Sequence, residues 1–196
     1  ARRKILNKNY KEGRKPPRLN RGARVLTESE ERTNKSWQLQ RLTEYFNEMP
    51  LMQFMFSGVE ADDVIAYLAR HKHYESWQKV IVSSDKDFFQ LLDDKTVLYR
   101  PVQKQVLNKK NLIEKHNIHP NNFALARAMA GDKSDNLEGV GNIGLATAYK
   151  RFPFLSGSDP VTLTEILKYS EEQLKNRKLK AYENVVNNSD ILKRNY

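Results

Sequence analysis

Short β-branched segments alternate with helical segments in the middle of the chain. Residues 79–84 (KVIVSS) and 95–101 (KTVLYRP) have the composition of strands, and an apolar run at 51–56 (LMQFMF) resembles a third. Apolar residues with helical spacing follow the run at 51–56, and DFFQLL over residues 87–92 predicts a short helix. Strands that alternate with helices are typical of a parallel sheet, so we expect an α/β fold.

Helical patterns flank this region on both sides. Residues 28–49 have the spacing of a long amphipathic helix, which Pro50 ends, and the β signal vanishes beyond Asn108. We therefore expect a core over residues 1–107 and a helical region over 108–196. The absence of cysteine excludes disulfides and thiolate metal sites, and no run approaches the roughly 18 apolar residues that span a bilayer. The sequence thus predicts a soluble, intracellular protein.

Positive charge is concentrated at the start of the chain. Residues 1–24 contain ten Lys or Arg and one Glu, whereas the remaining residues are nearly balanced. A block this basic favours a polyanionic partner, because each cation placed near a phosphate releases condensed counterions. The alternative interpretation is a solvated, disordered basic tail.

Acidic residues follow two of the expected strands. After the runs at 51–56 and 79–84 come Glu60, Asp62, Asp63, Asp85 and Asp87. Ligands bind at the carboxyl ends of such strands, where these side chains are expected to converge. Each cluster alone could cap a helix, since Ser57 to Glu60 matches a capping box. A cap needs only one or two carboxylates, however, and like charges packed together raise each other's pKa or bind a cation.

A third acidic pair lies in the polar loop AGDKSDNLEG. Asp132 and Asp135 in this loop would alone suggest an Asx turn. Together the three loops supply seven carboxylates and no His or Cys, which favours a cation that prefers oxygen, Mg²⁺ or Mn²⁺. With a basic segment in the same chain, hydrolysis of phosphodiesters by two metal ions is the predicted chemistry.

A glycine-rich segment, Gly139 to Gly144, satisfies the G-x-G-x-x-G pattern of dinucleotide sites, but no strand precedes it. Helical stretches on both sides indicate a helix–hairpin–helix instead. The exposed backbone N–H groups of such a hairpin bind a nucleic-acid phosphate. The residues expected to contact DNA, without reading bases, are Gly139, Gly141, Gly144, Lys150 and Arg151. A simple tight turn is the alternative.

The segments VEADD, SSDKDFFQL and AGDKSDNLEGVGNIG, in this order and spacing, resemble the 5′-nuclease or flap endonuclease family. The likeness is to phage-type 5′-3′ exonucleases and to the 5′-nuclease domain of bacterial DNA polymerase I, and it covers nearly the whole chain. It implies a PIN-like parallel-sheet nuclease core, with a basic helical arch over about 1–49, and a helix-three-turn-helix DNA-binding module at about 120–152.

The resemblance also implies roles for individual residues. The seven acids become ligands of two Mg²⁺ or Mn²⁺ ions, K⁺ binds at the hairpin, and Lys11 and Arg14 on the arch become catalytic cations. The implied activity is a 5′-3′ exonuclease or flap endonuclease of replication and repair, acting on DNA 5′ ends, flaps or RNA primers. The implied protein is a monomer of the bacterial or phage-infected cytoplasm with no membrane partner, and a DNA polymerase or single-strand-binding protein is its candidate partner.

Members of this family begin with two apolar strands that each end in Asp, and neither is present here. We therefore expect a fragment or a split gene product, whose activity in isolation is open. One alternative is a non-catalytic DNA-binding fragment whose acids bind structural cations. A second is a ribonuclease of the small toxin type, which would need neither the glycine hairpin nor the arch.

Overall fold

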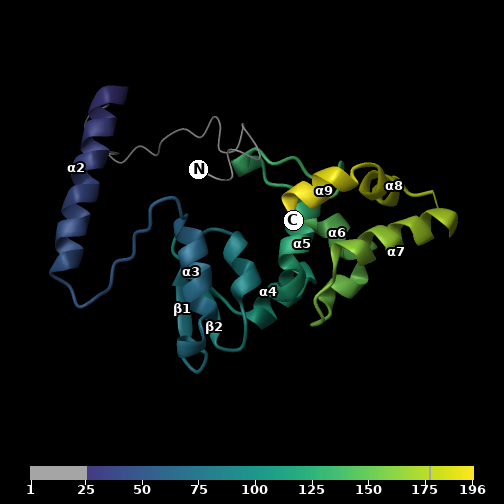
Figure 1. Cartoon of the computed structure of the whole chain (residues 1–196), viewed down its shortest axis with the longest axis horizontal. Helices are drawn as coiled ribbons and strands as arrows, with labels where there is room; N and C mark the ends of the chain where they lie inside the picture. Colours follow the sequence, from purple (N-terminus) through teal and green to yellow (C-terminus); the bar gives the residue numbers. More distant parts are fainter. Residues whose placement is uncertain (1–25, 177) are drawn as a thin grey trace. The chain divides into compact units, whose positions relative to one another are not determined.

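The computed structural model describes residues 26–176 and 178–196 (Figure 1). The chain divides into two compact units at Gly58. The described part of the smaller unit contains one helix, α2 (Glu28–Asn47). The described part of the larger unit, from Val59 onward, contains a small sheet and many short helices.

The larger unit has three strands and several helices in the following order. They are α3 (Ala61–Arg70), η1 (Lys72–Tyr74), β1 (Lys79–Val82), η2 (Asp87–Leu91), β2 (Thr96–Arg100), β3 (Gln105–Leu107), α4 (Lys109–His116), α5 (Pro120–Ala130), η3 (Lys133–Asp135), α6 (Leu145–Arg151), η4 (Pro153–Ser156), α7 (Leu163–Asn176), α8 (Lys180–Asn187) and α9 (Ser189–Asn195).

Helix α2 confirms the helix predicted over residues 28–49. It begins with a capping box, in which the Thr27 side chain accepts from the Glu30 backbone N–H and Glu30 Oε2 accepts from the Thr27 backbone N–H at 2.9 Å. The expected amphipathic packing is not seen, since α2 has no buried residue and Trp37 and Tyr45 are 57% and 68% exposed. Helix formation here follows from local capping and spacing rather than from burial of a face.

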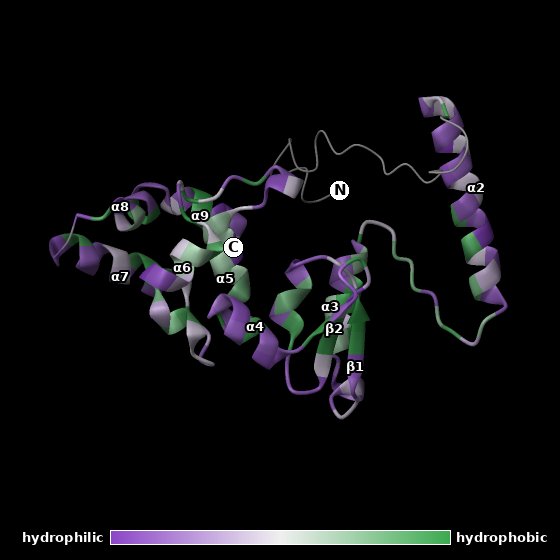
Figure 2. Ribbon diagram, turned by 180° about the vertical axis from the view of Figure 1, so that it is seen from behind, coloured by the Kyte–Doolittle hydropathy of each residue, from purple (hydrophilic) through white to green (hydrophobic). Residues whose placement is uncertain are grey.

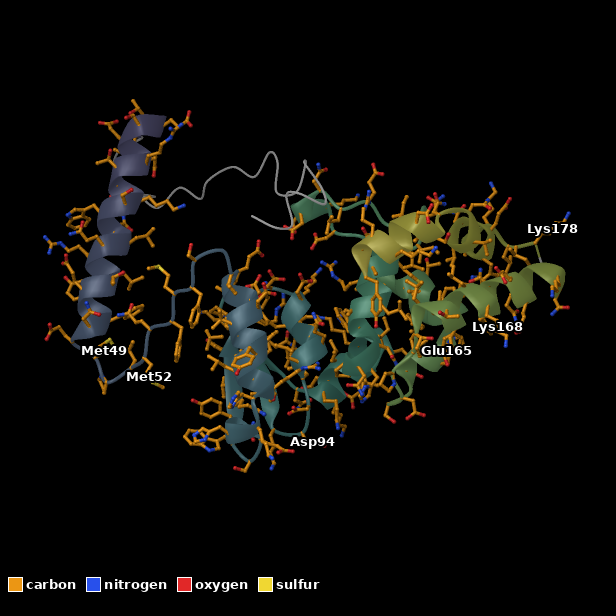
Figure 3. The ribbon with its side chains drawn as sticks, in the orientation of Figure 1. Met49, Met52, Asp94, Glu165, Lys168 and Lys178 are labelled. Atoms are coloured by element: carbon orange, nitrogen blue, oxygen red, sulfur yellow. The ribbon has the colours of Figure 1, made fainter. Side chains whose placement is uncertain are left out.

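The strand predicted over residues 51–56 is wrong, because this segment has no regular secondary structure. The side chains of this segment, including Met52, are exposed, and so is the side chain of the preceding Met49. Figure 3 labels both methionines. A strand exists only when a neighbouring strand satisfies its backbone groups. No strand in the described part of the chain pairs with residues 51–56, so apolar composition alone did not produce a strand.

The sheet has the order β1-β2-β3 and is mixed rather than wholly parallel. Strands β1 and β2 pair in parallel, with Val80 opposite Val97, which confirms the two predicted strands in shortened form. Strand β3 was not predicted, and it pairs antiparallel with β2 through a tight connection in which Lys104 has a φ of 50°. A three-residue strand gives too short an alternation of apolar and polar residues to be seen in the sequence.

Within the described residues, one face of the sheet is packed and the other is largely exposed. Ile81 of β1 and Leu98 of β2 are buried, and Phe89 of η2 lies 5.1 Å, centroid to centroid, from Phe123 of α5. Val80 and Val82 point to the other face and are 58% and 64% exposed. Figure 2 shows that β1 is hydrophobic over most of its length. The buried face therefore fixes the sheet against α5, which positions the loops that follow β1.

Helices dominate after Asn108, as predicted. Helix α5 begins at Pro120, whose missing N–H costs nothing in the first turn, and the Leu125 and Met129 side chains on it are buried. The rings of Phe152, Phe154, Tyr169 and Tyr182 pack together farther along the chain. One cluster of buried residues extends from the sheet into these helices. The expected division at residue 107 stays a prediction.

Candidate active site

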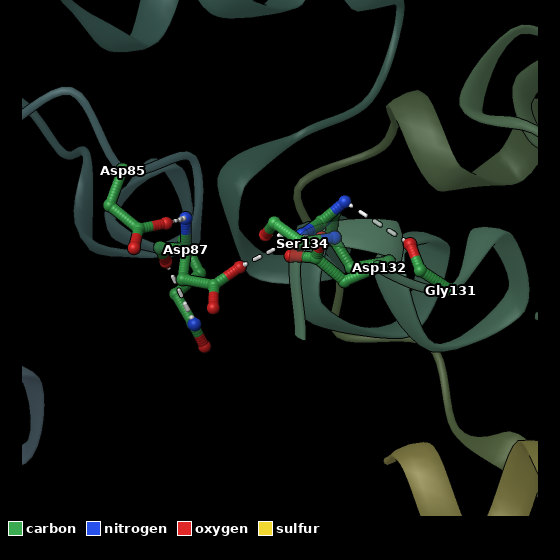
Figure 4. A network of polar contacts seen from close by, with 7 residues as sticks. Asp85, Asp87, Gly131, Asp132 and Ser134 are labelled. Carbon is green, nitrogen blue, oxygen red and sulfur yellow. Dashed lines mark hydrogen bonds and ion pairs between the residues drawn. The ribbon is translucent and has the colours of Figure 1, made fainter. Parts of the chain in front are cut away.

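Asp85 lies in the loop that follows β1, and Asp87 is the first residue of η2 (Figure 4). Asp85 Oδ1 accepts from the backbone N–H of Asp87 at 3.0 Å, and Ser83 Oγ accepts from the backbone N–H of Asp85 at 3.1 Å. Side-chain oxygens that accept from the backbone two residues ahead are typical of Asx and Ser turns. These turns direct the chain away from the strand end and fix the spacing of Asp85 and Asp87.

Asp132 lies in a second loop, between α5 and η3. Its Oδ1 accepts from the backbone N–H of Ser134 at 2.8 Å and from Ser134 Oγ at 2.7 Å. The backbones of Asp132 and Leu137 exchange two hydrogen bonds of 2.8 Å, which close the loop. The Asx turn considered as the alternative explanation of this acidic pair is therefore present, and it uses only one of the two Asp132 oxygens.

Arg127 connects the two acidic loops. Its Nη2 lies 3.4 Å from Asp87 Oδ1 and also contacts Asp132 Oδ2, while Nη1 donates to the Gly131 carbonyl at 3.2 Å. The Arg127 side chain is 18% exposed. A guanidinium presents several donors in one plane, so a single side chain can serve three acceptors. The last turn of α5 thus brings the sheet edge and the Asp132 loop together.

The two carboxylates on Arg127 have opposite pKa shifts. Partial burial raises the pKa of Asp87, the charge of Arg127 opposes this, and the charges of Asp85 and Asp132 raise it further. Burial also works to raise the pKa of Asp132, but the hydrogen bonds from Ser134 and the charge of Arg127 outweigh it, so the pKa is lowered. These interactions place Asp85, Asp87 and Asp132 within electrostatic reach of one another.

Of the other four predicted metal ligands, three lie at the start of α3 and one lies in η3. Glu60 is the N-cap residue of α3, and Asp62 and Asp63 lie in its first turn. Glu60 makes no side-chain capping hydrogen bond, and α3 begins at Ala61, so the capping box considered from Ser57 to Glu60 is wrong. Asp135 is 9% exposed and lies in η3. Across residues 26–176 and 178–196, no group of three or more His, Asp or Glu side chains forms a ready metal cage.

The glycine hairpin follows the Asp132 loop. Its segment packs against α5 so tightly that a Cβ on Gly139 would lie 2.4 Å from the carbonyl carbon of Ala130. The backbone N–H of Val140 donates to Met129 O at 2.8 Å, and Asn142 has a φ of 60°. A hollow of about 460 Å³ is lined by Lys133 and by residues of the segment 136–143. Backbone packing therefore requires a glycine at position 139, and its contact with DNA stays a prediction.

The other residues predicted to bind DNA have more free space around them than Gly139. A Cβ on Gly144 would have no neighbour within 4 Å, and one on Gly141 would meet only Asn184. Lys150 is exposed and Arg151 is half-buried, both in the last turn of α6. Helix, hairpin and helix are thus arranged as predicted. Lys11 and Arg14, the predicted catalytic cations, lie outside the described residues.

Three residues at this site were not predicted: Arg127, Asn184 and Asn195. The only sequence signal for Arg127 is its place in the last turn of α5, five residues before Asp132, where cations favour the helix dipole. Asn184 and Asn195 contact the hairpin from α8 and α9, more than forty residues away in sequence. No local pattern marks such a contact.

Comparison with known proteins agrees with this arrangement of a nuclease-type sheet, acidic loops and a helix–hairpin–helix. The family described as "5′-3′ exonuclease, N-terminal resolvase-like domain" matches residues 1–117. The match covers more than half of the chain. The chain therefore belongs to the 5′-3′ exonuclease family.

Curated proteins that include a 5′-3′ exonuclease also match the chain, over a slightly shorter segment than the family model does. A 5′-3′ exonuclease of Buchnera aphidicola subsp. Schizaphis graminum (strain Sg) is 36% identical over 111 residues, which cover 57% of this chain and 39% of the relative. The thermostable DNA polymerase I of Thermus aquaticus is 38% identical over 113 residues, 58% of this chain and 14% of the polymerase. The chain thus spans well under half the length of these relatives.

Solved structures of the T5 D15 protein have the same fold. One, co-crystallised with metal ions, superimposes with a TM-score of 0.73 at 23% identity, over 98% of this chain and 67% of its own. A bacteriophage T5 D15 flap endonuclease variant, in a complex with DNA and metal ions, gives a TM-score of 0.74 at 22% identity over the same shares. These likenesses confirm the 5′-nuclease fold.

Of the helices in the described residues, none is long and apolar enough to cross a membrane.

Proposed function

We propose that this chain forms the acidic site and the DNA-binding hairpin of a metal-dependent 5′-3′ exonuclease or flap endonuclease. The observation that carries the proposal is the Arg127 bridge, which joins Asp87 at the sheet edge to Asp132 beside the hairpin. The proposed substrate is DNA with 5′ ends or flaps, or an RNA primer on DNA, in the cytoplasm of a bacterial or phage-infected cell. A DNA polymerase or single-strand-binding protein is the proposed partner.

The donor set supports a hard divalent cation. Asp85, Asp87 and Asp132 offer carboxylate oxygens only, the ligands that Mg²⁺ and Mn²⁺ prefer. The contacts of Arg127 with two of these carboxylates support the proposal, because they show that positive charge is favourable at this place. The proposed holders of two ions are Glu60, Asp62, Asp63, Asp85, Asp87, Asp132 and Asp135. When bound, such metals activate a water and stabilise the departing oxygen.

The residues of the chain itself would bind and orient the substrate. Backbone N–H groups of the hairpin would donate to a phosphate of duplex DNA, with K⁺ as the proposed helper ion, and Lys150 would add a contact that does not depend on sequence. Lys11 and Arg14 would hold the scissile phosphate and stabilise charge that develops in the transition state. The hairpin and the acidic loops share α5, so duplex binding would set the position of the strand to be cut.

Two alternatives remain to be tested against this proposal. A non-catalytic DNA-binding fragment would bind duplex without cutting it, and membership in a nuclease family does not favour it. A toxin-type ribonuclease would have no use for the hairpin that follows Asp132.

The deciding experiment incubates the 196-residue chain with a 5′-flap duplex labelled on both strands, in Mg²⁺, Mn²⁺ or EDTA. We expect cleavage near the flap junction in either metal and none in EDTA. Binding without cleavage in both metals would favour the DNA-binding fragment. Cleavage of single-stranded RNA in preference to the flap would favour the ribonuclease.

A further inference from the structure

Two asparagines from the C-terminal helices reach back to the glycine hairpin. Asn195 ends α9 and Asn184 lies in α8, and both side chains donate to backbone carbonyls of the segment 138–141. The helices α8 and α9 have no role in the function proposed above. Their contacts with the hairpin suggest one.

Asn195 ties the start of the hairpin to α5. Its Nδ2 lies 2.7 Å from the Glu138 carbonyl oxygen and 3.1 Å from the Ala128 carbonyl oxygen. An amide nitrogen carries two hydrogens, so one side chain can serve both acceptors. Ala128 is the neighbour of Arg127 in the last turns of α5. The same helix end therefore holds both the acidic loops and the hairpin.

Asn184 holds the tip of the hairpin. Its Nδ2 lies 2.7 Å from the Gly141 carbonyl oxygen, and a Cβ on Gly141 would be 3.4 Å from that nitrogen. The backbone carbonyl of Asn184 accepts in turn from Asn188 Nδ2 at 2.9 Å, at the junction of α8 and α9. This anchor depends on tertiary structure, since 43 residues separate Asn184 from Gly141.

Anchoring a carbonyl also orients the N–H of the same peptide plane. In a trans peptide the C=O and N–H groups point in opposite directions. A Gly141 carbonyl held on α8 therefore turns the N–H of Asn142 away from α8, and a Glu138 carbonyl held on α9 turns the N–H of Gly139 away from α9. Within residues 26–176 and 178–196, neither N–H donates a hydrogen bond. Asn142 is exposed, so its N–H is open to an external acceptor, whereas the Gly139 nitrogen packs against Gly131.

We propose that Asn184 and Asn195 are positioning residues, which fix the hairpin so that its free N–H groups face a phosphate of duplex nucleic acid. This inference rests on the function proposed for the hairpin. In this proposal, α8 and α9 order the hairpin before DNA binds. The hairpin then loses little conformational entropy when it binds DNA. The two asparagines themselves do not touch the phosphate.

The test compares Asn184→Ala, Asn195→Ala and the double variant with Asn187→Ala, a matched control. Asn187 ends α8 and is exposed. Duplex affinity is measured by fluorescence anisotropy in EDTA at several KCl concentrations. We expect each single variant to lose about threefold to tenfold, on the scale of one or two lost hydrogen bonds, and the control to lose nothing. Asn184→Gln, which keeps the donor, should recover part of the loss.

The salt dependence separates positioning from charge. Backbone N–H contacts release no counterions, so the slope of log K against log[KCl] should stay as in the wild type for the asparagine variants. Lys150→Ala should instead reduce the magnitude of that slope by up to about one. Asparagine variants that reduce the slope as Lys150→Ala does would overturn the proposal, and so would wild-type affinity in the double variant.

A second readout does not depend on DNA. In the free protein, ¹⁵N order parameters of residues 139–144 should fall from about 0.85 toward 0.6 or below in the double variant, with unchanged values in α5. If the wild-type chain does not bind duplex, the proposed function of the hairpin fails, and the order parameters still decide whether the two asparagines hold it. Unchanged order parameters in a folded double variant would overturn the inference.

Discussion

Arg127 Nη2 lies 3.4 Å from Asp87 Oδ1, although the two residues are 40 positions apart and belong to different elements. The same nitrogen contacts Asp132, so one cation holds two acidic loops that would otherwise repel each other. This bridge makes the stability of the metal-free protein depend on Arg127. It also makes the acidic site and the end of α5 a single structural unit.

Replacing Arg127 by Leu should destabilise the metal-free chain by about 1–3 kcal/mol, because partly buried carboxylates lose their charged donor. Thermal unfolding in EDTA measures this loss. Mg²⁺ should raise the melting temperature of the variant more than that of the wild type, since the metal then supplies the missing charge. Arg32→Leu is the matched control, because its exposed pair with Glu28 is screened by solvent and should contribute little to stability. Equal effects of both substitutions would contradict the bridge.

Asp85→Asn should abolish metal-dependent cleavage and leave duplex binding nearly unchanged. The substitution neutralises a proposed metal ligand but keeps an oxygen that can accept from the Asp87 backbone N–H. Single-turnover cleavage and anisotropy measure the two effects separately. Asp94→Asn, on an exposed carboxylate paired with Lys109, is the control and should cleave normally. Full turnover by Asp85→Asn in Mg²⁺ would remove Asp85 from the site.

Gly144→Val and Gly139→Ala should fail in different ways. A Cβ on Gly139 would collide with the Ala130 backbone, so the alanine variant should lose several kcal/mol of stability. A Cβ on Gly144 meets nothing within 4 Å, so the fold should tolerate it, whereas a phosphate approaching the hairpin would be blocked. Chemical denaturation and duplex binding distinguish the two. A stable Gly144→Val variant with wild-type affinity would place the phosphate elsewhere.

His116 should make the fold sensitive to mild acid. Burial lowers its pKa, and the charges of Lys115, Lys86 and Arg100 lower it further. The unfolded chain therefore binds a proton more tightly, and stability should fall as the pH drops below the ordinary histidine value of about 6.5 toward the lower folded pKa. His116→Phe, which keeps a ring beside Phe89 and Phe123, should show a smaller loss between about pH 7 and pH 5. Equal losses would exclude His116 as the cause.

Lys11→Ala should lower single-turnover cleavage by about 10² or more with a far smaller loss of affinity, if the basic segment acts as an ordered arch. Lys4→Ala removes the same charge elsewhere in the segment and should cost mainly salt-dependent binding. Both positions lie outside the described residues, so this prediction comes from the family resemblance. If both substitutions reduce cleavage equally and added DNA rescues both, the segment is an electrostatic tail.

The sequence alone determined the features that depend on neighbours in the chain. The helix within residues 28–49, the positions of the two strands and the Asx turn at Asp132 follow from residue types that lie close together in the chain. The order of three acidic motifs before a glycine hairpin was enough to indicate the nuclease family. These features arise from backbone geometry and hydrogen bonds between residues a few positions apart.

Tertiary structure decided whatever required a distant partner. The apolar run at 51–56 has strand composition but forms no strand, because its backbone finds no neighbour in the described part of the chain. Arg127 and Asn195 look like ordinary polar residues on helices, and only the packing of α5 against the sheet and of α9 against the hairpin gives them their contacts. A pattern along the chain reports which side of an element is apolar, whereas the partner of a polar side chain depends on where the whole chain brings a complementary atom within about 3 Å.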